Sequence, residues 1–511
     1  MRTRCNEWLI SISLGAIAVL FASPLMAQTN SWLAPFSDEW EAFPDWQFGL
    51  PSVTQSAVII SNATSKVVTI DKQTAHKFPG SVTISNLIVS AQNGVTNTLM
   101  LNKVDDMELH VLNGLTLGNS PPVGESELIS SKSTLVVDGL LGGELLDDGV
   151  MLITGGSLIA TNCSIQVGTD TAIGVLTISK AVVLARDLTI TSGGLSSGSV
   201  VVAGGTMTLS SFLTVGNGFF NSPGSLLLAN DTVLVVTNGE TDIGGLSESS
   251  GSMTVSDATF FAADVFLGGV RSVGTLEIGK GSRVTVGGQL GIGFGVQGSG
   301  SVFLDGGELD VTNGPTHIGV GLPSSANNLA VSGGLFLARD VSVGATNSGG
   351  TLSINGGTSI LSSNLQVGVP ISSATVLITA GHLFVTNAPI VVDSIGASNA
   401  QCIVSGGHLA SQSIQLGVSD EGALIVNAGS VSASVGITLG DCNGTGVGNA
   451  TVDGGQLTVT NSAGTGFIDV RNGVLTLSSG VLRVDKLVMT NTCGSFVHTG
   501  GTLIVGTVVG P

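Results

Sequence analysis

The chain contains 511 residues, of which 75 are glycine, 42% are hydrophobic, 10% are charged and 4% are aromatic. Such an apolar chain lacks the low hydrophobicity of disordered proteins, and 13 prolines without glycine at every third position exclude collagen. The 35 acidic and 16 basic residues give a net charge of −19, which argues against nucleic acid as a partner. The remaining class is a glycine-rich, acidic all-β repeat array.

The chain begins with the features of an export signal peptide, which we place at residues 1-27. Arg2 and Arg4 precede an apolar stretch over residues 9–21, and Ala27 stands before the expected cleavage site. The apolar stretch is shorter than the ~20 residues that span a bilayer, so a transmembrane anchor is the less favoured alternative. We therefore expect an exported chain with no membrane span in its mature part. Its expected location is extracellular or on the outer-membrane surface, with the periplasm as the other compartment.

Residues 149-511 consist of a repeat of ~25 residues, which is clearest at 301–321. Each unit contains three short strands with alternating apolar residues, such as Val302 and Leu304 in the first strand. A Gly-Gly pair marks the first turn, an Asn-Gly turn follows the second strand, and a loose turn of variable length follows the third. One unit therefore describes one circuit of a coil.

The spacing of these strands predicts the fold. A short strand with one apolar face cannot bury that face alone, whereas three strands wound into a coil can bury it inside. Neighbouring coils then pair in parallel, about 4.8 Å apart, and glycine suits the corners that recur in every coil. We predict an all-β fold, a right-handed single-stranded parallel β-helix, which is a three-faced solenoid with ~25 residues per coil.

Two units resemble the secreted β-solenoid repeat proteins of Gram-negative bacteria: Ser-Val-Val-Val-Ala-Gly-Gly-Thr-Met-Thr-Leu at 199–209 and Gly-Gly-Thr-Leu-Ile-Val at 500–505. This group includes autotransporter passenger domains and autotransporter-associated β-strand repeats. The resemblance covers residues 149-511 well and 52–148 loosely. It implies a cell-surface protein of a Gram-negative bacterium. No translocator barrel follows the repeats, so we expect an open C-terminal coil.

The N-terminal stretch differs from the repeats in composition, because aromatic and acidic residues alternate over 28-50. Its aromatic residues include Trp32, Trp40, Trp46 and Phe43. We interpret this segment as a cap over the open end of the first coil, followed by irregular first coils over 51-148. The alternative is a sugar-binding platform in which these aromatic rings contact a glycan beside acidic groups.

Parallel β-helices also include polysaccharide lyases and hydrolases, which need several carboxylates and basic residues on one face of adjacent coils. Asp257, Lys280 and Asp305 fall near the first turn of three consecutive coils. An aspartate at this position also makes the hydrogen bonds of a turn. We therefore interpret the three residues as turn residues and predict no catalytic site.

Two Arg-Asp pairs share one position of the repeat: Arg186-Asp187 and Arg339-Asp340. They lie six coils apart, or ~29 Å, so they cannot form one active site. We expect both pairs to be solvated corners.

His382 and His408 occupy equal positions in adjacent coils and should stack ~5 Å apart. A zinc site needs three or four ligands, and the neighbouring coils offer Ser359 and Ser430 there. The run Gly-Ile-Gly-Phe-Gly at 291–295 follows no strand–helix–strand pattern, so it does not predict a nucleotide site. We predict neither a metal nor a cofactor.

Four cysteines remain once Cys5 has left with the signal peptide: Cys163, Cys402, Cys442 and Cys493. Cys442 and Cys493 share a position of the repeat but lie two coils apart, or ~10 Å. This separation exceeds the ~7 Å that a disulfide allows between Cα atoms. We predict four free and largely inert thiols.

The regular positions of the repeat are taken up by core and turn residues. We therefore predict an exported structural or interaction protein, adhesin-like or displayed at the surface, without catalytic activity. The alternatives are a polysaccharide lyase or glycoside hydrolase on a parallel β-helix, and a glycan-binding protein. The expected partner is a cell-surface glycan or a protein, and the apolar last strands predict end-to-end self-association.

Overall fold

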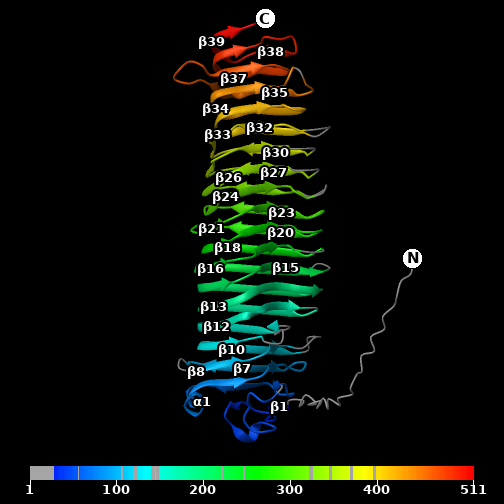
Figure 1. The fold of residues 1–511 in the computed structure, drawn as a ribbon, viewed down its shortest axis with the longest axis vertical. Helices are drawn as coiled ribbons and strands as arrows, with labels where there is room; N and C mark the ends of the chain where they lie inside the picture. Colours follow the sequence, from blue (N-terminus) through cyan, green and yellow to red (C-terminus); the bar gives the residue numbers. More distant parts are fainter. Residues whose placement is uncertain are drawn as a thin grey trace, which may run out of the picture.

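The structure is a computed structural model that describes residues 28–55, 57–104, 107–118, 124–139, 144–145, 149–169, 171–219, 222–245, 248–321, 326–344, 348–368, 372–394, 399–442 and 444–510. The predicted signal peptide, residues 1-27, lies outside the described residues. In Figure 1 the coils stack into an elongated rod, with β1 near the lower end and β39 at the upper end. No helix among the described residues is long and apolar enough to cross a membrane.

The elements up to residue 117 are short. In chain order they are β1 Thr29–Ser31, β2 Asp38–Glu39, the 3-10 helix η1 Phe43–Asp45, β3 Ala57–Ile60, β4 Lys66–Ile70, α1 Lys72–Lys77, β5 Gly80–Ile84, β6 Leu87–Val89, β7 Thr96–Asn102, β8 Met107–Val111 and β9 Leu115–Leu117.

From residue 125 onward some strands continue around the corners and are much longer. The first group is β10 Glu125–Val137, β11 Glu144–Leu145, β12 Val150–Thr169, β13 Ile173–Gly194, β14 Ser197–Leu209, β15 Leu213–Phe219, β16 Pro223–Val236, β17 Glu240–Ile243, β18 Ser250–Ala262, β19 Asp264–Leu267, β20 Val273–Ile278, β21 Arg283–Val286, β22 Leu290–Ile292 and β23 Ser299–Leu304. The second group is β24 Glu308–Ile318, β25 Asn328–Val331, β26 Leu335–Val343, β27 Gly350–Ile354, β28 Thr358–Leu361, β29 Leu365–Val367, β30 Ala374–Ile378, β31 His382–Val385, β32 Ile390–Val392, β33 Ala400–Leu416, β34 Glu421–Leu439, β35 Val447–Val459, β36 Phe467–Val470, β37 Gly473–Val488, β38 Gly494–His498 and β39 Thr502–Val509.

Each coil contributes three strand positions, and each position pairs in parallel with the same position of the next coil. The strands β27, β28 and β29 of one coil pair with β30, β31 and β32 of the next. The predicted all-β parallel solenoid is confirmed, with about 25 residues per turn, almost no helix and about 16 turns. The ladder also extends into the irregular coils, because β4, β7, β10 and β12 pair in succession.

The core is a set of aliphatic ladders that run along the rod. One ladder passes in register from Leu352 through Val376 and Cys402 to Leu424, and all four side chains are buried. Side chains alternate between the inside and the outside of a strand, so a register slip of one residue would turn such a ladder outward. The alternating apolar residues of the repeat therefore determine both the inside of the coil and the pairing between coils.

The Gly-Gly corners are required by close contact between coils. Gly407 has a φ of 66°, and a Cβ added there would lie 2.5 Å from the carbonyl oxygen of Gly381 in the preceding coil. A larger residue would meet both a left-handed backbone and a clash with backbone. The recurrence of glycine at this corner is thus a packing requirement of the stacked coils.

Candidate functional site

The tryptophans of the N-terminal segment belong to the core. Trp32, Trp40 and Trp46 are 2%, 0% and 3% exposed, and the ring of Trp46 lies edge-on to the other two at 5.0 and 4.9 Å between centroids. The indole N–H of Trp46 donates a hydrogen bond to the carbonyl oxygen of Trp40 at 2.8 Å. Buried ring faces cannot stack on a sugar, so of the four aromatic residues named for a glycan platform only Phe43, at 66% exposure, is open to solvent.

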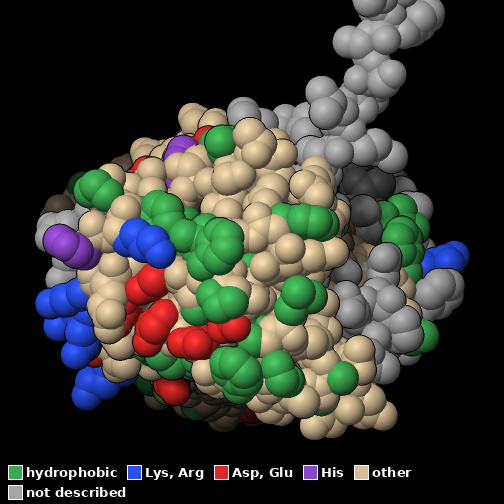
Figure 2. Space-filling view, turned by 90° about the horizontal axis from the view of Figure 1, so that it is seen from below, with side chains coloured by type: hydrophobic (Ala, Val, Ile, Leu, Met, Phe, Trp, Pro, Cys, Tyr) green, Lys and Arg blue, Asp and Glu red, His purple; other side chains and the backbone are tan. Residues whose placement is uncertain are grey.

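The outer surface of this N-terminal end is acidic. Figure 2 shows a group of Asp and Glu side chains there, with hydrophobic side chains around it and Lys and Arg at one edge. Burial raises the pKa of Glu39, and the like charges of Asp71, Glu41 and Asp38 raise it further. The described residues contain no group of three or more His, Cys, Asp or Glu side chains able to hold a metal ion.

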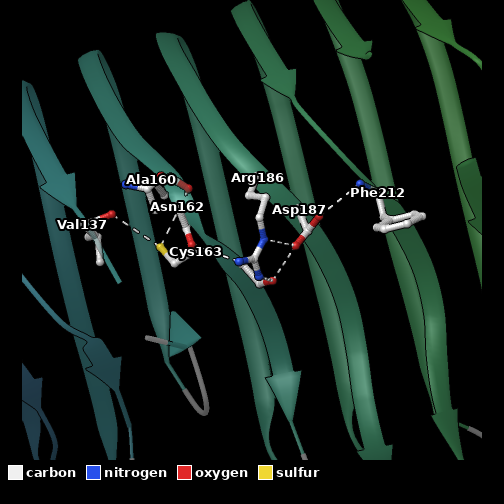
Figure 3. Close-up of polar contacts among 8 residues, drawn as sticks. Val137, Ala160, Asn162, Cys163, Arg186, Asp187 and Phe212 are labelled. Carbon is white, nitrogen blue, oxygen red and sulfur yellow. Dashed lines mark hydrogen bonds and ion pairs between the residues drawn. The ribbon is translucent and has the colours of Figure 1, made fainter. Parts of the chain in front are cut away.

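The first Arg-Asp pair ties three coils together (Figure 3). Arg186 pairs with Asp187 at 2.7 Å and donates to the carbonyl oxygen of Asn162 in the preceding coil at 3.0 Å. The other oxygen of Asp187 accepts from the backbone N–H of Phe212 in the following coil at 3.2 Å. Burial alone would raise the pKa of Asp187, but the hydrogen bonds from Arg186, Phe212 and Ser164 outweigh it and lower that pKa.

The second pair repeats this arrangement. Arg339 pairs with Asp340 at 2.6 Å and donates to the carbonyl oxygen of Asn313 in the preceding coil at 3.0 Å. The Arg186 and Arg339 side chains are 48% and 45% exposed, which agrees with the expectation of solvated corners. We call these two arrangements the Arg-Asp clamps, because each holds a corner to its neighbours.

The other candidate groups also lie at corners or on the surface. Asp257 adopts a φ of 51°, typical of a turn, and among the described residues no ion pair joins Lys280 to Asp257 or Asp305. The structure therefore does not join these three side chains into a charged cluster.

The two histidines pair in register as predicted, with ring centroids 6.2 Å apart. His408 Nδ1 lies 2.8 Å from the hydroxyl of Ser430. Burial lowers the pKa of His408, and His382 lowers it further. The expectation for Ser359 is wrong: Thr358 stands beside His382, and Ser359 points into the core at 0% exposure, because successive residues of a strand face opposite sides.

The third strands of the coils around residue 266 carry an open pocket of about 420 Å³. Asp242 of β17 pairs in register with Phe266 of β19, which in turn pairs with Gly291 of β22. The ring of Phe294, from the loose turn after β22, lies 4.6 Å from that of Phe266 between centroids, at an angle of 41°. We call this the Phe266–Phe294 pocket.

Gly291 makes this pairing of rings possible. A Cβ added to Gly291 would lie 2.8 Å from Phe266 Cδ1 and 3.2 Å from Phe294 Cδ2. Both rings therefore use the space that a side chain at this position would occupy. The glycines of the 291–295 run thus allow close packing at a corner. The sequence alone shows only that this run does not predict a nucleotide site.

Asp242 also lines the pocket and supplies its carboxyl, while Thr214 and Asn217 are its other polar side chains. Burial raises the pKa of its carboxyl to about 6, and the nearby Glu240 contributes to this rise. In mild acid the group is therefore partly protonated, so it can donate a hydrogen bond as well as accept one. Apolar rings beside one carboxyl suit a ligand with an apolar face and hydroxyl groups.

Sequence reasoning missed this pocket for a definite reason. Phe266 lies on a strand while Phe294 lies in a loose turn, and the length of that turn varies from coil to coil. The register of the strands predicts which residues stack, but it does not predict how a turn folds over them. The signal that was present is the scarcity of aromatic residues, at 4% of the chain, which makes two phenylalanines in adjacent coils noteworthy.

Comparison of the chain with protein-family models, with curated proteins and with solved structures finds no match. The class of protein is therefore defined by its fold, an all-β parallel β-solenoid with about 25 residues per turn. The likeness to autotransporter passenger domains depends on the sequence of the repeats alone.

Proposed function

We propose that the protein is an exported, non-catalytic β-solenoid that serves as a structural and interaction rod at the cell surface of a Gram-negative bacterium, and that its Phe266–Phe294 pocket contacts a glycan. The observation that carries this proposal is the pairing of the two rings in a pocket that Asp242 also lines. A sugar presents C–H groups to an aromatic ring and hydroxyl groups to a carboxyl, so both halves of the pocket have a complementary group.

The use of the other polar side chains supports the structural part of the proposal. The two Arg-Asp clamps bind backbone groups of neighbouring coils, and His408 is held by Ser430. These side chains stabilise corners and strand pairs rather than converge on a cavity. Most of the outer polar side chains that the sequence suggests as catalytic or metal-binding candidates thus form contacts between neighbouring coils.

The test measures binding of the purified protein to a panel of immobilised bacterial polysaccharides. Phe294→Ala should weaken the binding at least tenfold, because the ring is 46% exposed and forms one wall of the pocket. The matched control is Phe303→Ala, which removes a ring that is 40% exposed elsewhere on the rod and should leave the binding unchanged. Equal binding by Phe294→Ala and the unchanged chain would contradict the proposal.

A glycoside hydrolase is the second candidate, and one observation favours it. Asp242 has a raised pKa of about 6 while Glu240 stands two residues away on the same face of β17. Hydrolases that use two carboxylates require one protonated and one ionised group. Release of reducing ends from a polysaccharide, lost in both Asp242→Asn and Glu240→Gln, would establish this candidate in place of the non-catalytic rod.

A further inference from the structure

Two corners near the C-terminal end bring Cys442 and Cys493 together. Cys442 follows β34 and Cys493 precedes β38, so 51 positions separate them in the chain. Their Sγ atoms lie 3.2 Å apart, and the thiol of Cys442 donates a hydrogen bond to the sulfur of Cys493. The coil spacing of ~10 Å therefore does not keep the two side chains apart, although both thiols are free, as predicted.

The corner between them explains the close approach. The coil in between turns from β36, which ends at Val470, to β37, which begins at Gly473, through only Arg471 and Asn472. The segments that contain the two cysteines, between β34 and β35 and between β37 and β38, are longer than this corner. Multiplying the coil spacing assumes corners of equal length, and that assumption fails at this position.

Hydrogen bonds within the turns hold the two cysteines in place. The side-chain oxygen of Asn491 accepts from the backbone N–H groups of Cys493 and Gly494, at 3.1 and 3.2 Å. On the other side, the backbone N–H of Asp441 donates to the carbonyl oxygen of Gly446 at 3.0 Å. The contact between the sulfurs thus joins two turns, each of which is stabilised by hydrogen bonds within the turn.

The other two mature cysteines have a different environment. Cys163 and Cys402 are 3% and 1% exposed and lie in the core, whereas Cys442 is half-buried and Cys493 is exposed. All four are free thiols in the structure. Only the pair at the corners combines proximity with access to a reagent in solution.

We propose that Cys442 and Cys493 form an intramolecular disulfide when the protein meets a disulfide oxidant, whether a protein or a small molecule. One cysteine thiolate attacks the disulfide of the oxidant, which releases one thiol and leaves a mixed disulfide. The second cysteine thiolate then attacks the mixed disulfide and releases the other thiol. The two cysteines together lose two protons and two electrons, and the disulfide of the oxidant is reduced to two thiols.

The cross-link would act on the last coils of the rod. Among the described residues the strands β38 and β39 pair with β37 on one side only, and Val497, Ile504 and Val508 in them are 40%, 47% and 54% exposed. A bond between the turn after β34 and the turn before β38 bridges the corner at which the coil of β35 and β36 passes into the coil of β37. We therefore expect the oxidised form to resist opening of the C-terminal coils.

The test treats the purified mature chain, residues 28–511, with oxidised glutathione, alkylates the remaining thiols under denaturing conditions, and maps the peptides by mass spectrometry without reduction. The expected result is a peptide that joins Cys442 to Cys493, with Cys163 and Cys402 both alkylated. Alkylation of all four cysteines after the oxidant, or a disulfide between two copies of the chain, would overturn the proposal. Because this measurement needs neither export nor a ligand, its failure is distinguishable from failure of the proposed function.

Limited proteolysis provides the second readout. Oxidised protein should be cleaved after residue 442 several-fold more slowly than protein reduced with dithiothreitol, because opened coils are the cleaved species. Cys493→Ser should abolish this difference while it leaves the circular dichroism spectrum unchanged, since the residue is exposed. An equal effect of the oxidant on Cys493→Ser would show that another reaction protects the coils, and the proposal would be wrong.

Discussion

A single type of side chain has different chemistry at different positions of the coil. Burial raises the pKa of the Cys402 thiol to about 12, because it replaces an aliphatic residue in a core ladder. Cys442 and Cys493 lie at corners, where solvent and a neighbouring sulfur are both within reach. The carboxyls show the same contrast, since burial raises the pKa of Asp242 whereas hydrogen bonds lower that of Asp187.

Asp242→Asn should remove a loss of folding stability that the buried Asp242 carboxylate causes at neutral pH. Burial raises the pKa of Asp242 from 3.8 to about 6, so the folded chain holds this proton more tightly than the unfolded chain. The resulting stability is fully present below the unfolded pKa and is lost as the pH rises through the folded pKa. We expect Asp242→Asn to be more stable than the unchanged chain by about 1–2 kcal/mol near neutral pH, after allowance for solvent screening.

The measurement is chemical unfolding at a series of pH values between the two pKa values of Asp242. Asp305→Asn is the matched control, because it removes a carboxyl that is exposed at a corner, and it should not reproduce the gain in stability expected of Asp242→Asn. Parallel pH profiles for Asp242→Asn and the unchanged chain would show that burial does not perturb this carboxyl.

At the scale of elements, the unit of stability is a strand position together with its neighbours above and below. The aliphatic ladders bury the inner face of each strand, and the Arg-Asp clamps join the outer corners. Repeat proteins of this kind unfold through local contacts between neighbours rather than through one global event. A substitution at one corner should therefore destabilise its own coil and the adjacent coils and leave distant coils unchanged.

Asp187→Ala should accelerate hydrogen exchange at the backbone amide of Phe212 about tenfold, because that amide loses its acceptor. Asp187 has a lowered pKa, so the protection is present above its unfolded pKa and is lost as the pH falls through the folded pKa. Exchange monitored by mass spectrometry at single-residue resolution checks this prediction. Asp340→Ala should leave Phe212 unchanged, since the second clamp lies six coils away.

The sequence predicts strands and their stacking better than it predicts corners. Alternating apolar residues and Gly-Gly pairs are sufficient for the three strand positions and the ladder from Leu352 to Leu424. The contact of Cys442 with Cys493 and the ring of Phe294 over Phe266 both depend on the paths of turns. A turn has no periodic pattern, and its conformation depends on the length of the turns in neighbouring coils. For this reason the pocket and the cysteine pair could not be derived from the repeat.

The whole molecule is a rod whose length follows from the number of coils. About 16 turns at ~4.8 Å each give a length of roughly 80 Å. Small-angle X-ray scattering of residues 28–511 should therefore yield the distance distribution of a rod of this length at low concentration. A distribution typical of a sphere of the same mass would contradict the solenoid.

We also propose that copies of the chain associate end to end through the last coil, where Ile504 and Val508 are 47% and 54% exposed. Unpaired strand edges with exposed apolar side chains favour pairing with another chain. The scattering length should increase with concentration for the unchanged chain and not for Ile504→Lys combined with Val508→Lys. A length independent of concentration in the unchanged chain would contradict the association.

The parallel ladders have a mechanical consequence. Hydrogen bonds between coils point along the axis of the rod, so a force that pulls the two ends apart acts on them coil by coil in series. Such a rod yields by peeling one coil at a time from an end, and its resistance does not grow with its length. Bending loads the same hydrogen bonds, because it opens them on the convex side of the rod, so stretching and bending are resisted by one set of ladders.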